Sequence, residues 1–379
     1  MRNEKKRSIC PAALHRTIMI LPAINQKIVI LFTLSLFLLS FSWNIVNKTA
    51  IKPECGETTV IQEKITQNTT KIELMPQPKK EVLVLIWHWP WGYTFPLDRC
   101  YQDVGIPGCK MTTDRSLYSV ADAVVMHHVE IMYNKNLLPQ KPRPIFQYWV
   151  WANVEPPMII QNLDILDNLF NMTMTFRQDS DVFVPYGQIE TLKEPQNFTI
   201  PEKSKLVAWV VSKWYPGVRR IAYYEEFKKY ISIDVYGKKH TKLDMDNLHS
   251  TLSQYKFYLA FENSEYKDYI TEKLWTNAFT SWTVPVVLGT SRENYERFVP
   301  GDAFIHVDDF ASPKELADYL LELDKDEEKY RKYFNWRSLY GVKLLTGWQH
   351  KYCQVCEVIS RAPRYQTIHS VAKWFLNKS

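Results

Sequence analysis

The amino-acid sequence predicts an α/β protein built on parallel, doubly wound sheets. The unbroken apolar run at residues 82–87 is typical of a strand that is buried on both faces. Later in the chain, strand patterns alternate with amphipathic helix patterns, which is the order that produces parallel sheets. The length of 379 residues allows two domains of roughly 150 residues each. Ligands of such sheets bind at the carboxyl ends of the strands.

The predicted elements follow one another regularly. The first half holds short strands at residues 123–126 and 149–151, separated by proline-rich loops. The second half is expected to hold strands at residues 206–212, 257–261, 284–288 and 304–307, and helices at residues 219–231 and 267–279. A further helix is expected to begin with a capping box at Ser312 and Glu315. Its predicted core face is Leu316, Tyr319, Leu320 and Leu323.

Residues 28–46 form an uncharged apolar run of about 19 residues, close to the length that crosses a bilayer. Most of the net charge of +6 lies in residues 1–27, ahead of this run. Positive charge stays on the cytoplasmic side, so we expect a cytoplasmic tail, a single-pass type II signal-anchor and a lumenal body in the Golgi membrane. A cleaved signal peptide is the alternative, but the run is long for one and no small-residue cleavage site follows it. The nearly neutral body argues against nucleic acid as a partner.

The polar residues 47–80 are expected to form a stem. Glycosylation signals at Asn68, Asn171 and Asn197 lie on the proposed lumenal side. Six cysteines fit the same oxidising compartment. Four of them are expected to form disulfides and can pair in three ways, namely Cys100, Cys109, Cys353 and Cys356. Cys353, Cys356 and His350 could instead form half of a zinc site, although no second C-x-x-C is present.

The richest chemistry lies at residues 256–289. A buried strand ends in polar residues, and a helix is expected to begin a few residues later. This pattern brings Asn263, Tyr269, Glu272 and Lys273 to a strand end and a helix N-terminus, where backbone N–H groups favour phosphate. A lysine is unusual at that end of a helix, and a bound anion would explain it. The alternative is that Glu272 and Lys273 form an ordinary solvated face.

These residues resemble the Lewis-type α1,3-fucosyltransferases of glycosyltransferase family 10. The resemblance rests on FENS at 261–264, YITEK at 269–273 and VPVVLG at 284–289. It continues through residues 291–295, 304–306 and 333–336 and the last cysteine pair, and backward through residues 170–177, 179–181 and 184–187. It covers essentially residues 81–376.

The resemblance implies the GT-B fold, two Rossmann-like domains that face each other across a cleft. Residues 81–205 would bind the acceptor, residues 206–358 would bind GDP-fucose, and residues 359–379 would pack back on the body. The implied reaction is inverting transfer of L-fucose from GDP-β-L-fucose to O3 of GlcNAc in N-acetyllactosamine-type glycans of glycoproteins and glycolipids. A type II membrane lectin and a catalytically inactive family member are the alternatives.

The resemblance also implies site residues. Arg220 and Lys273 would neutralise the diphosphate, and Asn263, Tyr269 and Glu272 would hold the rest of the donor. Ser212 and Tyr258 would line the same cleft, while Lys213 stands where the family usually has Asn.

The implied general base is Glu155, which follows a W-x-W pattern and precedes Pro156. An inverting transfer needs one carboxylate to take the proton of the acceptor hydroxyl. Val129 is an acceptor candidate, and because the family's O4-associated Trp is absent there, it favours O3 linkage. Gln102 is a weaker acceptor candidate.

Two patterns could suggest metal ions. Asp179 and Asp181 form a D-x-D motif, but a polar segment precedes it where an apolar strand is required. His127 and His128 are adjacent, but no H-E-x-x-H motif exists. We therefore expect no metal and no cofactor, with the leaving diphosphate stabilised by protein cations.

Overall fold

This computed structural model describes residues 81–361 and 363–377. All of the described residues belong to one compact unit, Leu74–Ser379. The predicted tail, signal-anchor and stem, with Asn68, lie outside the described residues. Within the described ranges, no helix is long and apolar enough to cross a membrane.

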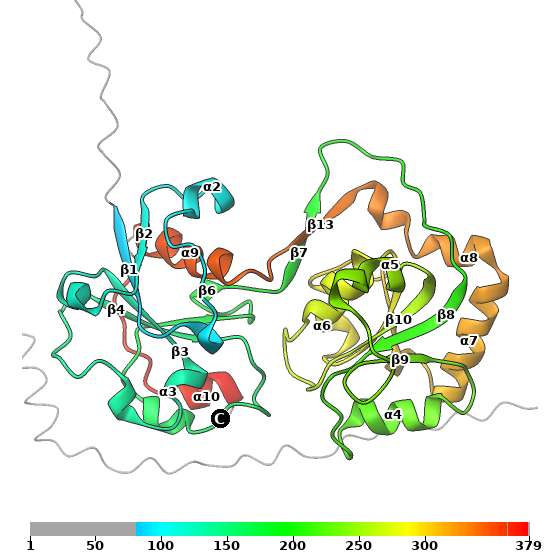
Figure 1. Cartoon of the computed structure of the whole chain (residues 1–379), viewed down its shortest axis with the longest axis horizontal. Coiled ribbons are helices and arrows are strands. Elements are labelled where there is room, and N and C mark those ends of the chain that lie inside the picture. Colours follow the sequence, from blue (N-terminus) through cyan, green and yellow to red (C-terminus); the bar gives the residue numbers. More distant parts are fainter. Residues whose placement is uncertain (1–80, 362, 378–379) are drawn as a thin grey trace, which may run out of the picture. The chain divides into compact units, whose positions relative to one another are not determined.

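The first sheet has six strands in the order β2-β1-β3-β4-β5-β6, and every neighbouring pair is parallel. Its strands are β1 (Val82–Ile86), β2 (Cys109–Thr112), β3 (Ala123–His127), β4 (Tyr148–Asn153), β5 (Met172–Thr175) and β6 (Val182–Phe183). The strands are almost fully buried because helices or loops cover both faces. Figure 1 shows this sheet with helices around it, namely α2 (Cys100–Val104), α3 (His128–Ile131), α9 (Trp348–Ser360) and α10 (Val371–Leu376).

The last helices of the chain return to this first sheet. The helix α9 (Trp348–Ser360) shares a buried core with β1, β3 and β4 through Tyr352, Val355 and Ile359. The helix α10 (Val371–Leu376) buries Val371 and Phe375 in the core on the other side. The predicted domain boundary at residue 358 therefore falls inside α9.

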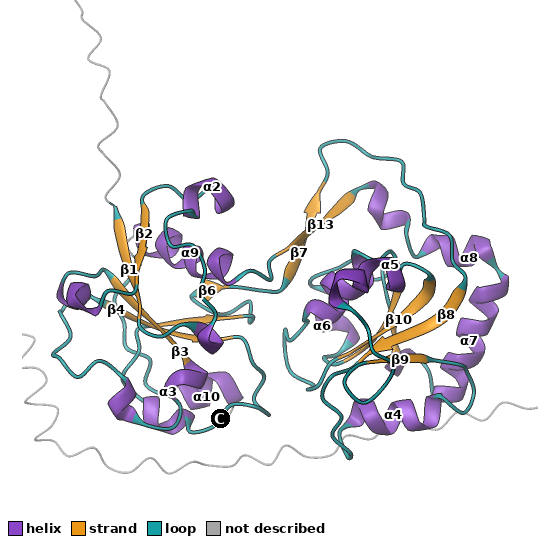
Figure 2. Ribbon diagram, viewed as in Figure 1, coloured by secondary structure: helices purple, strands orange, loops and turns teal. Residues whose placement is uncertain are grey.

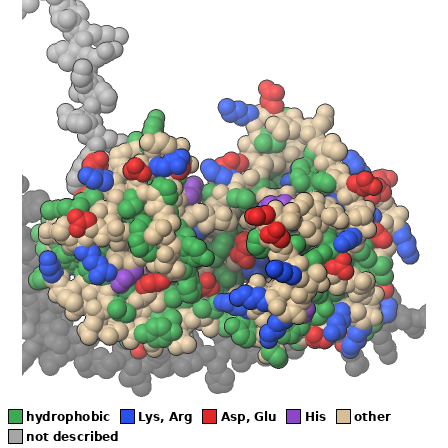
Figure 3. All heavy atoms as spheres, viewed as in Figure 1, with side chains coloured by type: hydrophobic (Ala, Val, Ile, Leu, Met, Phe, Trp, Pro, Cys, Tyr) green, Lys and Arg blue, Asp and Glu red, His purple; other side chains and the backbone are tan. Residues whose placement is uncertain are grey.

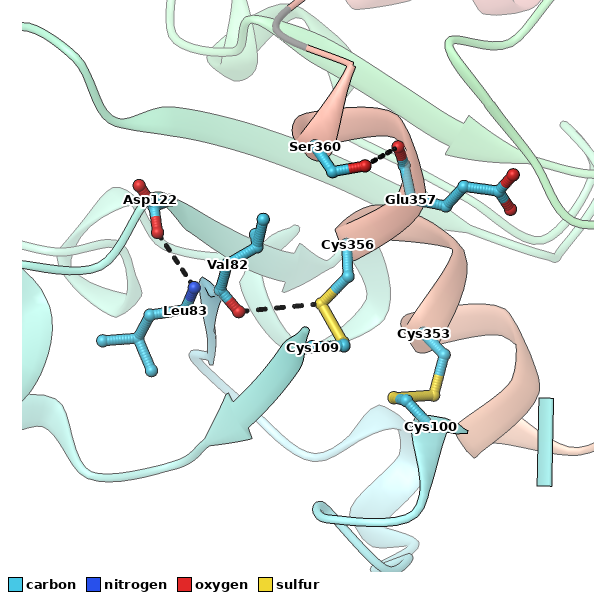
Figure 4. Close-up of a disulfide and its surroundings, with 9 residues drawn as sticks. All are labelled: Val82, Leu83, Cys100, Cys109, Asp122, Cys353, Cys356, Glu357 and Ser360. Atoms are coloured by element: carbon cyan, nitrogen blue, oxygen red, sulfur yellow. Dashed lines mark hydrogen bonds between the residues drawn. A yellow bond between two sulfur atoms is a disulfide. The ribbon is translucent and has the colours of Figure 1, made fainter. Parts of the chain in front are cut away.

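Two disulfides fix α9 to the beginning of the fold. Cys100 bonds Cys353 and Cys109 bonds Cys356 (Figure 4). The predicted disulfide set is confirmed, and the half zinc site is wrong because both of its cysteines are in disulfides. Each bridge closes a loop of about 250 residues, which restricts the unfolded chain strongly.

The second sheet is also parallel, with the order β12-β11-β10-β8-β9. Its strands are β8 (Lys205–Val210), β9 (Asp234–Tyr236), β10 (Tyr255–Phe261), β11 (Val284–Leu288) and β12 (Ile305–His306). Helices and loops again cover both faces (Figure 2). The helices are α4 (Arg219–Phe227), α5 (Leu248–Leu252), α6 (Arg292–Glu296), α7 (Pro313–Lys325) and α8 (Glu327–Lys332). Two parallel α/β halves are what the sequence predicts.

A two-stranded antiparallel ribbon joins the halves. The chain leaves the first sheet after β6 through β7 (Gly187–Thr191) and returns to α9 through β13 (Tyr340–Leu344). These two strands pair from Thr191 and Tyr340 to Gly187 and Leu344, and Figure 1 shows them side by side. Gly187 packs against the indole of Trp275, where an added Cβ would lie 2.5 Å from the ring. The pairing of β7 with β13 holds the two connections together as one ribbon.

The predicted helix at residues 267–279 is wrong at its beginning. The observed element is a π-helix, η6 (Lys273–Phe279), so Tyr269 precedes the helix. The segment before it is irregular because Asp268 adopts a left-handed backbone with φ of 62°. The side chains of Asp268 and Asn294 are hydrogen-bonded, and the Asp268 N–H donates to the Asn294 side chain at 2.7 Å.

Other predicted boundaries differ less. The strand at residues 284–288 is confirmed, while the helix predicted at residues 219–231 ends at Phe227. Ser312 caps α7 by accepting the Glu315 N–H, but the Glu315 carboxylate accepts from Ala311 rather than from Ser312. The predicted capping box is therefore only half formed. Short 3-10 helices lie at Pro90–Gly92, Arg115–Ser119, Lys135–Leu137, Leu163–Leu166, Met245–Asn247, Val307–Asp309 and Asn335–Ser338.

Candidate active site

A cavity of about 320 Å³ lies at the carboxyl ends of β8 and β10 and also reaches Glu155. The predicted residues that line it are Glu155, Ser212, Arg220, Asn263, Tyr269, Glu272 and Lys273. Tyr186, Val210, Val211, Lys213, Met245, Leu248 and Asn277 complete its wall. On the face shown in Figure 3, Lys and Arg side chains gather near α4. The structure thus brings the donor candidates and the base candidate to one cavity.

Glu155 follows the buried end of β4 and is held by Asn153. The Asn153 side chain donates to the Glu155 carbonyl at 2.7 Å and accepts the Glu155 N–H at 3.2 Å. Asn153 is fully buried, so it fixes the turn that carries the carboxylate. Burial raises the pKa of Glu155, and Lys213 and Lys273 act in the opposite direction. A carboxylate with a raised pKa is suited to accept a proton.

Lys273 is the centre of an ion-pair cluster. Its Nζ lies 3.0 Å from Glu262 Oε2 and 3.0 Å from Glu272 Oε1, and it donates to Thr271 Oγ1 at 2.7 Å. Burial acts to lower the pKa of Lys273, but Glu262 and Glu272 outweigh it and the pKa is raised. Lys273 is therefore a fixed cation with two carboxylate partners.

Glu262 is a site residue that the sequence reasoning missed. Its side chain is 1% exposed and accepts the Thr271 N–H at 2.8 Å as well as the Thr271 hydroxyl at 2.9 Å. It supports Lys273 from behind without lining the cavity. Its position directly after an apolar strand was the available signal, because a carboxylate at such a place needs a partner.

Arg220 supplies a second buried cation. It is 4% exposed, and its Nη2 donates to the Lys213 carbonyl at 2.6 Å. Within the described chain it makes no ion pair with a carboxylate, and its Nε has no hydrogen-bond partner. The Asn263 Oδ1 is also buried and unpartnered. Both residues line the cavity, so a polar ligand there would satisfy them.

Tyrosines form the apolar part of the site. Tyr269 is buried against Phe176 and lies beside Tyr186, with ring centroids 6.5 Å apart. Tyr186, which the sequence reasoning did not select, donates its hydroxyl to the Val154 carbonyl at 2.9 Å. Tyr258 was predicted to line the cleft but is fully buried behind the cavity. Its hydroxyl accepts from Asn277, which lines the wall in its place.

The predicted acceptor residues do not line this cavity. Gln102 is exposed on α2 and Val129 is half-buried on α3. Beside Val129, Glu130 accepts the Trp91 N–H at 2.8 Å and bonds His127 Nδ1 at 2.8 Å. An acceptor role for Gln102 or Val129 would therefore require an acceptor that extends beyond the cavity.

The two metal-like patterns are occupied by internal contacts. Asp179 binds Arg177 through both oxygens, and Asp181 accepts from Thr173. His128 bonds the Gln161 carbonyl, and burial lowers its pKa to about 4. In the part of the chain that the structure describes, no three potential ligand side chains gather as a metal site.

The predicted glycosylation sites differ in accessibility. Asn171 is 0% exposed; its amide donates to the Gln366 carbonyl at 2.7 Å and accepts the Trp149 N–H at 2.8 Å. The Asn171 amide is part of the core, so the folded structure leaves no room for a glycan on it. Asn197 is exposed.

Comparisons with known proteins cover nearly all of the described chain. The description "Fucosyltransferase, N-terminal" matches residues 79–187, and "Glycosyltransferase family 10 (fucosyltransferase) C-term" matches residues 200–374. The chain is 49% identical over 299 residues to "3-galactosyl-N-acetylglucosaminide 4-alpha-L-fucosyltransferase FUT3" of Homo sapiens, which covers 78% of this chain and 82% of that protein. It is 48% identical over 298 residues to "4-galactosyl-N-acetylglucosaminide 3-alpha-L-fucosyltransferase 9" of Mus musculus, covering 78% and 83%.

A solved structure shares the fold. The "Crystal Structure of alpha1,3-Fucosyltransferase with GDP-fucose" matches with a TM-score of 0.52 and 18% identity, over 82% of this chain and 96% of that one.

Proposed function

This chain belongs to glycosyltransferase family 10, the fucosyltransferases, and on that premise we propose that it transfers L-fucose from GDP-β-L-fucose to O3 of GlcNAc in N-acetyllactosamine-type glycans. The observation that carries the proposal is that Glu155, Arg220 and Lys273 line one cavity. Relatives named for transfer to either linkage are 48–50% identical, so identity does not decide between them. The preference for O3 rests on position 129, where Val129 replaces the Trp that the resemblance associates with O4.

The donor occupies the side of the cavity formed by β8 and β10. Arg220 and Lys273 face the diphosphate, and the unpartnered Arg220 Nε and Asn263 Oδ1 supply a donor and an acceptor for the nucleotide sugar. Ser212, Tyr269 and Glu272 complete the contacts. Fixed cations at the leaving group stabilise the charge that develops in the transition state.

Glu155 acts as the general base. Its carboxylate takes the proton of the acceptor hydroxyl as that oxygen attacks C1 of fucose. The bond from C1 to the phosphate oxygen breaks, GDP leaves with the electron pair, and the configuration at C1 inverts. Burial raises the pKa of Glu155 and thereby makes its carboxylate a better proton acceptor.

We propose that the reaction needs no metal ion and no cofactor, and that the two halves form the GT-B arrangement with the acceptor on the side of Glu155. The remaining parts of the proposal concern residues 1–80. Residues 28–46 anchor the protein in the Golgi membrane, residues 47–80 form the stem, and the catalytic body is lumenal.

The test is to incubate the purified full-length chain with GDP-fucose and N-acetyllactosamine. The expected product carries fucose on O3 of GlcNAc. A Galβ1-3GlcNAc acceptor, in which only O4 is open at the corresponding place, is expected to react more slowly. Donor binding without product indicates an inactive member, and glycan binding without any use of GDP-fucose indicates a lectin; either result contradicts the proposal.

A further inference from the structure

Lys351 is a buried cation that the proposed mechanism does not use. It lies in α9 and is 2% exposed. Among the described residues, no carboxylate lies within ion-pair distance of it. Its Nζ instead donates to the carbonyls of Leu345 at 2.6 Å, Pro185 at 2.7 Å and Val184 at 3.4 Å. A charged lysine is costly to bury without a carboxylate partner, so its position in the fold needs a physical reason.

The three carbonyls belong to the two connections between the halves. Val184 and Pro185 lie where the chain leaves β6 for β7, and Leu345 lies where it returns from β13 to α9. These connections are about 160 residues apart along the chain. One ammonium group therefore joins both connections at the end of the β7–β13 ribbon that faces the first sheet.

The next residue along, Tyr186, connects Lys351 to the active site. Lys351 Nζ lies 5.0 Å from the centre of the Tyr186 ring, within the range of a cation–π contact. Tyr186 packs against the cores of both halves and lines the cavity. Its hydroxyl donates to the carbonyl of Val154, the residue directly before Glu155. A continuous series of contacts thus runs from Lys351 through Tyr186 to the turn that carries the base.

We infer that Lys351 is a positioning residue for the transfer reaction, because it fixes both connections and thereby holds Tyr186 against the turn of Glu155. The inference rests on the proposed function. Lys351 neither lines the active-site cavity nor contacts a reacting group, so it affects the reaction only through the positions of other residues. A displacement of about 1 Å in a catalytic group can lower a rate on the order of a hundredfold.

Lys351 also borders a second cavity. The volume of this cavity is about 370 Å³, and Gln188, Gln354 and apolar residues line it as well. The charged or titratable groups around this cavity are Lys343 on β13 and His350 and Glu357 on α9, while Tyr186 faces Lys351 from the connection. Burial lowers the pKa of Lys351 to about 7. An ammonium has three N–H groups for three carbonyls, whereas a neutral amine has two.

The first test compares Lys351→Met and Lys343→Met with the wild type as full-length chains. In Lys351→Met we expect kcat to fall about tenfold while the KM for GDP-fucose changes less than about twofold. Lys343→Met is the matched control, because Lys343 lines the same cavity but is exposed and pairs with Glu190 at 3.0 Å. It should keep the wild-type kcat. Wild-type kcat in folded Lys351→Met overturns the inference, whereas a wild type that transfers no fucose overturns the proposed function and the inference with it.

Lys351→Arg separates positioning from simple stability. A guanidinium keeps its charge at every pH used and can still donate to the carbonyls, so kcat should be largely restored. Wild-type kcat should decline on the alkaline side of about pH 7, where Lys351 loses its proton, and Lys351→Arg should lack this decline. An identical alkaline decline in both proteins contradicts the inference.

A double-mutant cycle covers the case in which Lys351→Met folds poorly. Tyr186→Phe removes the hydroxyl that bonds Val154. If Lys351 acts through Tyr186, the losses in kcat for Lys351→Gln and Tyr186→Phe should not add in the double variant. Fully additive losses overturn the inference.

Discussion

Each half of the protein places functional side chains at the carboxyl ends of its own parallel strands, but the two halves place opposite charges there. The first half brings one carboxylate, Glu155, whose pKa is raised by burial. The second half brings Lys273 between two carboxylates and Arg220 beside backbone carbonyls. The comparison teaches that the Glu155 carboxylate has no direct ion pair among the described residues, whereas the donor side already holds its cations through contacts within the protein.

The donor side itself contains two different kinds of cation. Lys273 already has Glu262 and Glu272 as ion-pair partners, so its positive charge is compensated before a ligand binds. Arg220 has no carboxylate partner in the described ranges and has a free Nε. We therefore expect Arg220 to supply more of the charge that meets the diphosphate, and Lys273 to contribute more to stability.

The largest effect is expected for Glu155→Gln. The amide keeps the shape of the side chain but cannot accept the proton, so kcat should fall by about 10² to 10⁴-fold. The measurement is the rate of fucose transfer at saturating donor and acceptor. Turnover at the wild-type rate would mean that another group is the base.

Lys273→Met should be costly to stability. It leaves Glu262, which is 1% exposed, without its cation, and breaking a buried pair costs roughly 3–5 kcal/mol. Chemical denaturation measures the free energy of unfolding. The double variant Lys273→Met with Glu262→Gln is the matched control and should recover much of the loss; no recovery would show that the pair is not the cause.

Arg220→Met should weaken donor binding more than it lowers the stability of the fold. The loss of charge-assisted hydrogen bonds, about 1.5–3 kcal/mol, corresponds to a rise in the Kd of GDP of roughly 10- to 150-fold. Titration calorimetry with GDP measures it. A smaller rise than in Lys273→Met would reverse the assignment of the two cations.

The dependence of kcat on pH tests the environment of Glu155. Glu155 must be deprotonated to accept a proton, so kcat falls as pH falls through its pKa. Because burial raises that pKa, the midpoint of the acid limb should lie above the ordinary value of 4.5. Below it, kcat should drop about tenfold per pH unit. A midpoint at or below 4.5 would contradict the assigned environment.

The smallest effect is expected from removal of divalent metal ions. If Arg220 and Lys273 provide the positive charge for the leaving group, EDTA should leave kcat unchanged. Activity lost with EDTA and restored with Mg²⁺ or Mn²⁺ would contradict metal-free transfer, whereas restoration by dilution alone would point to an unspecific effect.

Local patterns in the sequence predicted much of the fold. The apolar run at residues 284–288 is β11, and the polar ends of β8 and β10 do meet at one cavity. Features that the local pattern does not reveal depend on distant contacts. The expected helix before Lys273 is interrupted by Asp268, whose partner Asn294 is 26 residues away. Asn171 carries a glycosylation signal, but its amide bonds Gln366, 195 residues away.

The same limit explains the residues that were missed. Tyr186 was missed because its hydroxyl bonds the Val154 carbonyl, 32 residues away. Tyr258 is buried behind the cavity, and Asn277, which donates to its hydroxyl, lines the wall instead. The disulfide pairing had three solutions in the sequence, and only the packing of α9 on the first sheet selects one.

The most direct test of the division between the halves is a titration of Glu155→Gln with GDP-fucose. Because the proposed donor site is formed by Arg220, Asn263 and Lys273, this variant should bind GDP-fucose within about twofold of the wild-type Kd while it forms almost no product. Loss of GDP-fucose binding together with turnover would contradict the account, because it would make Glu155 a donor-binding residue rather than the base that faces it.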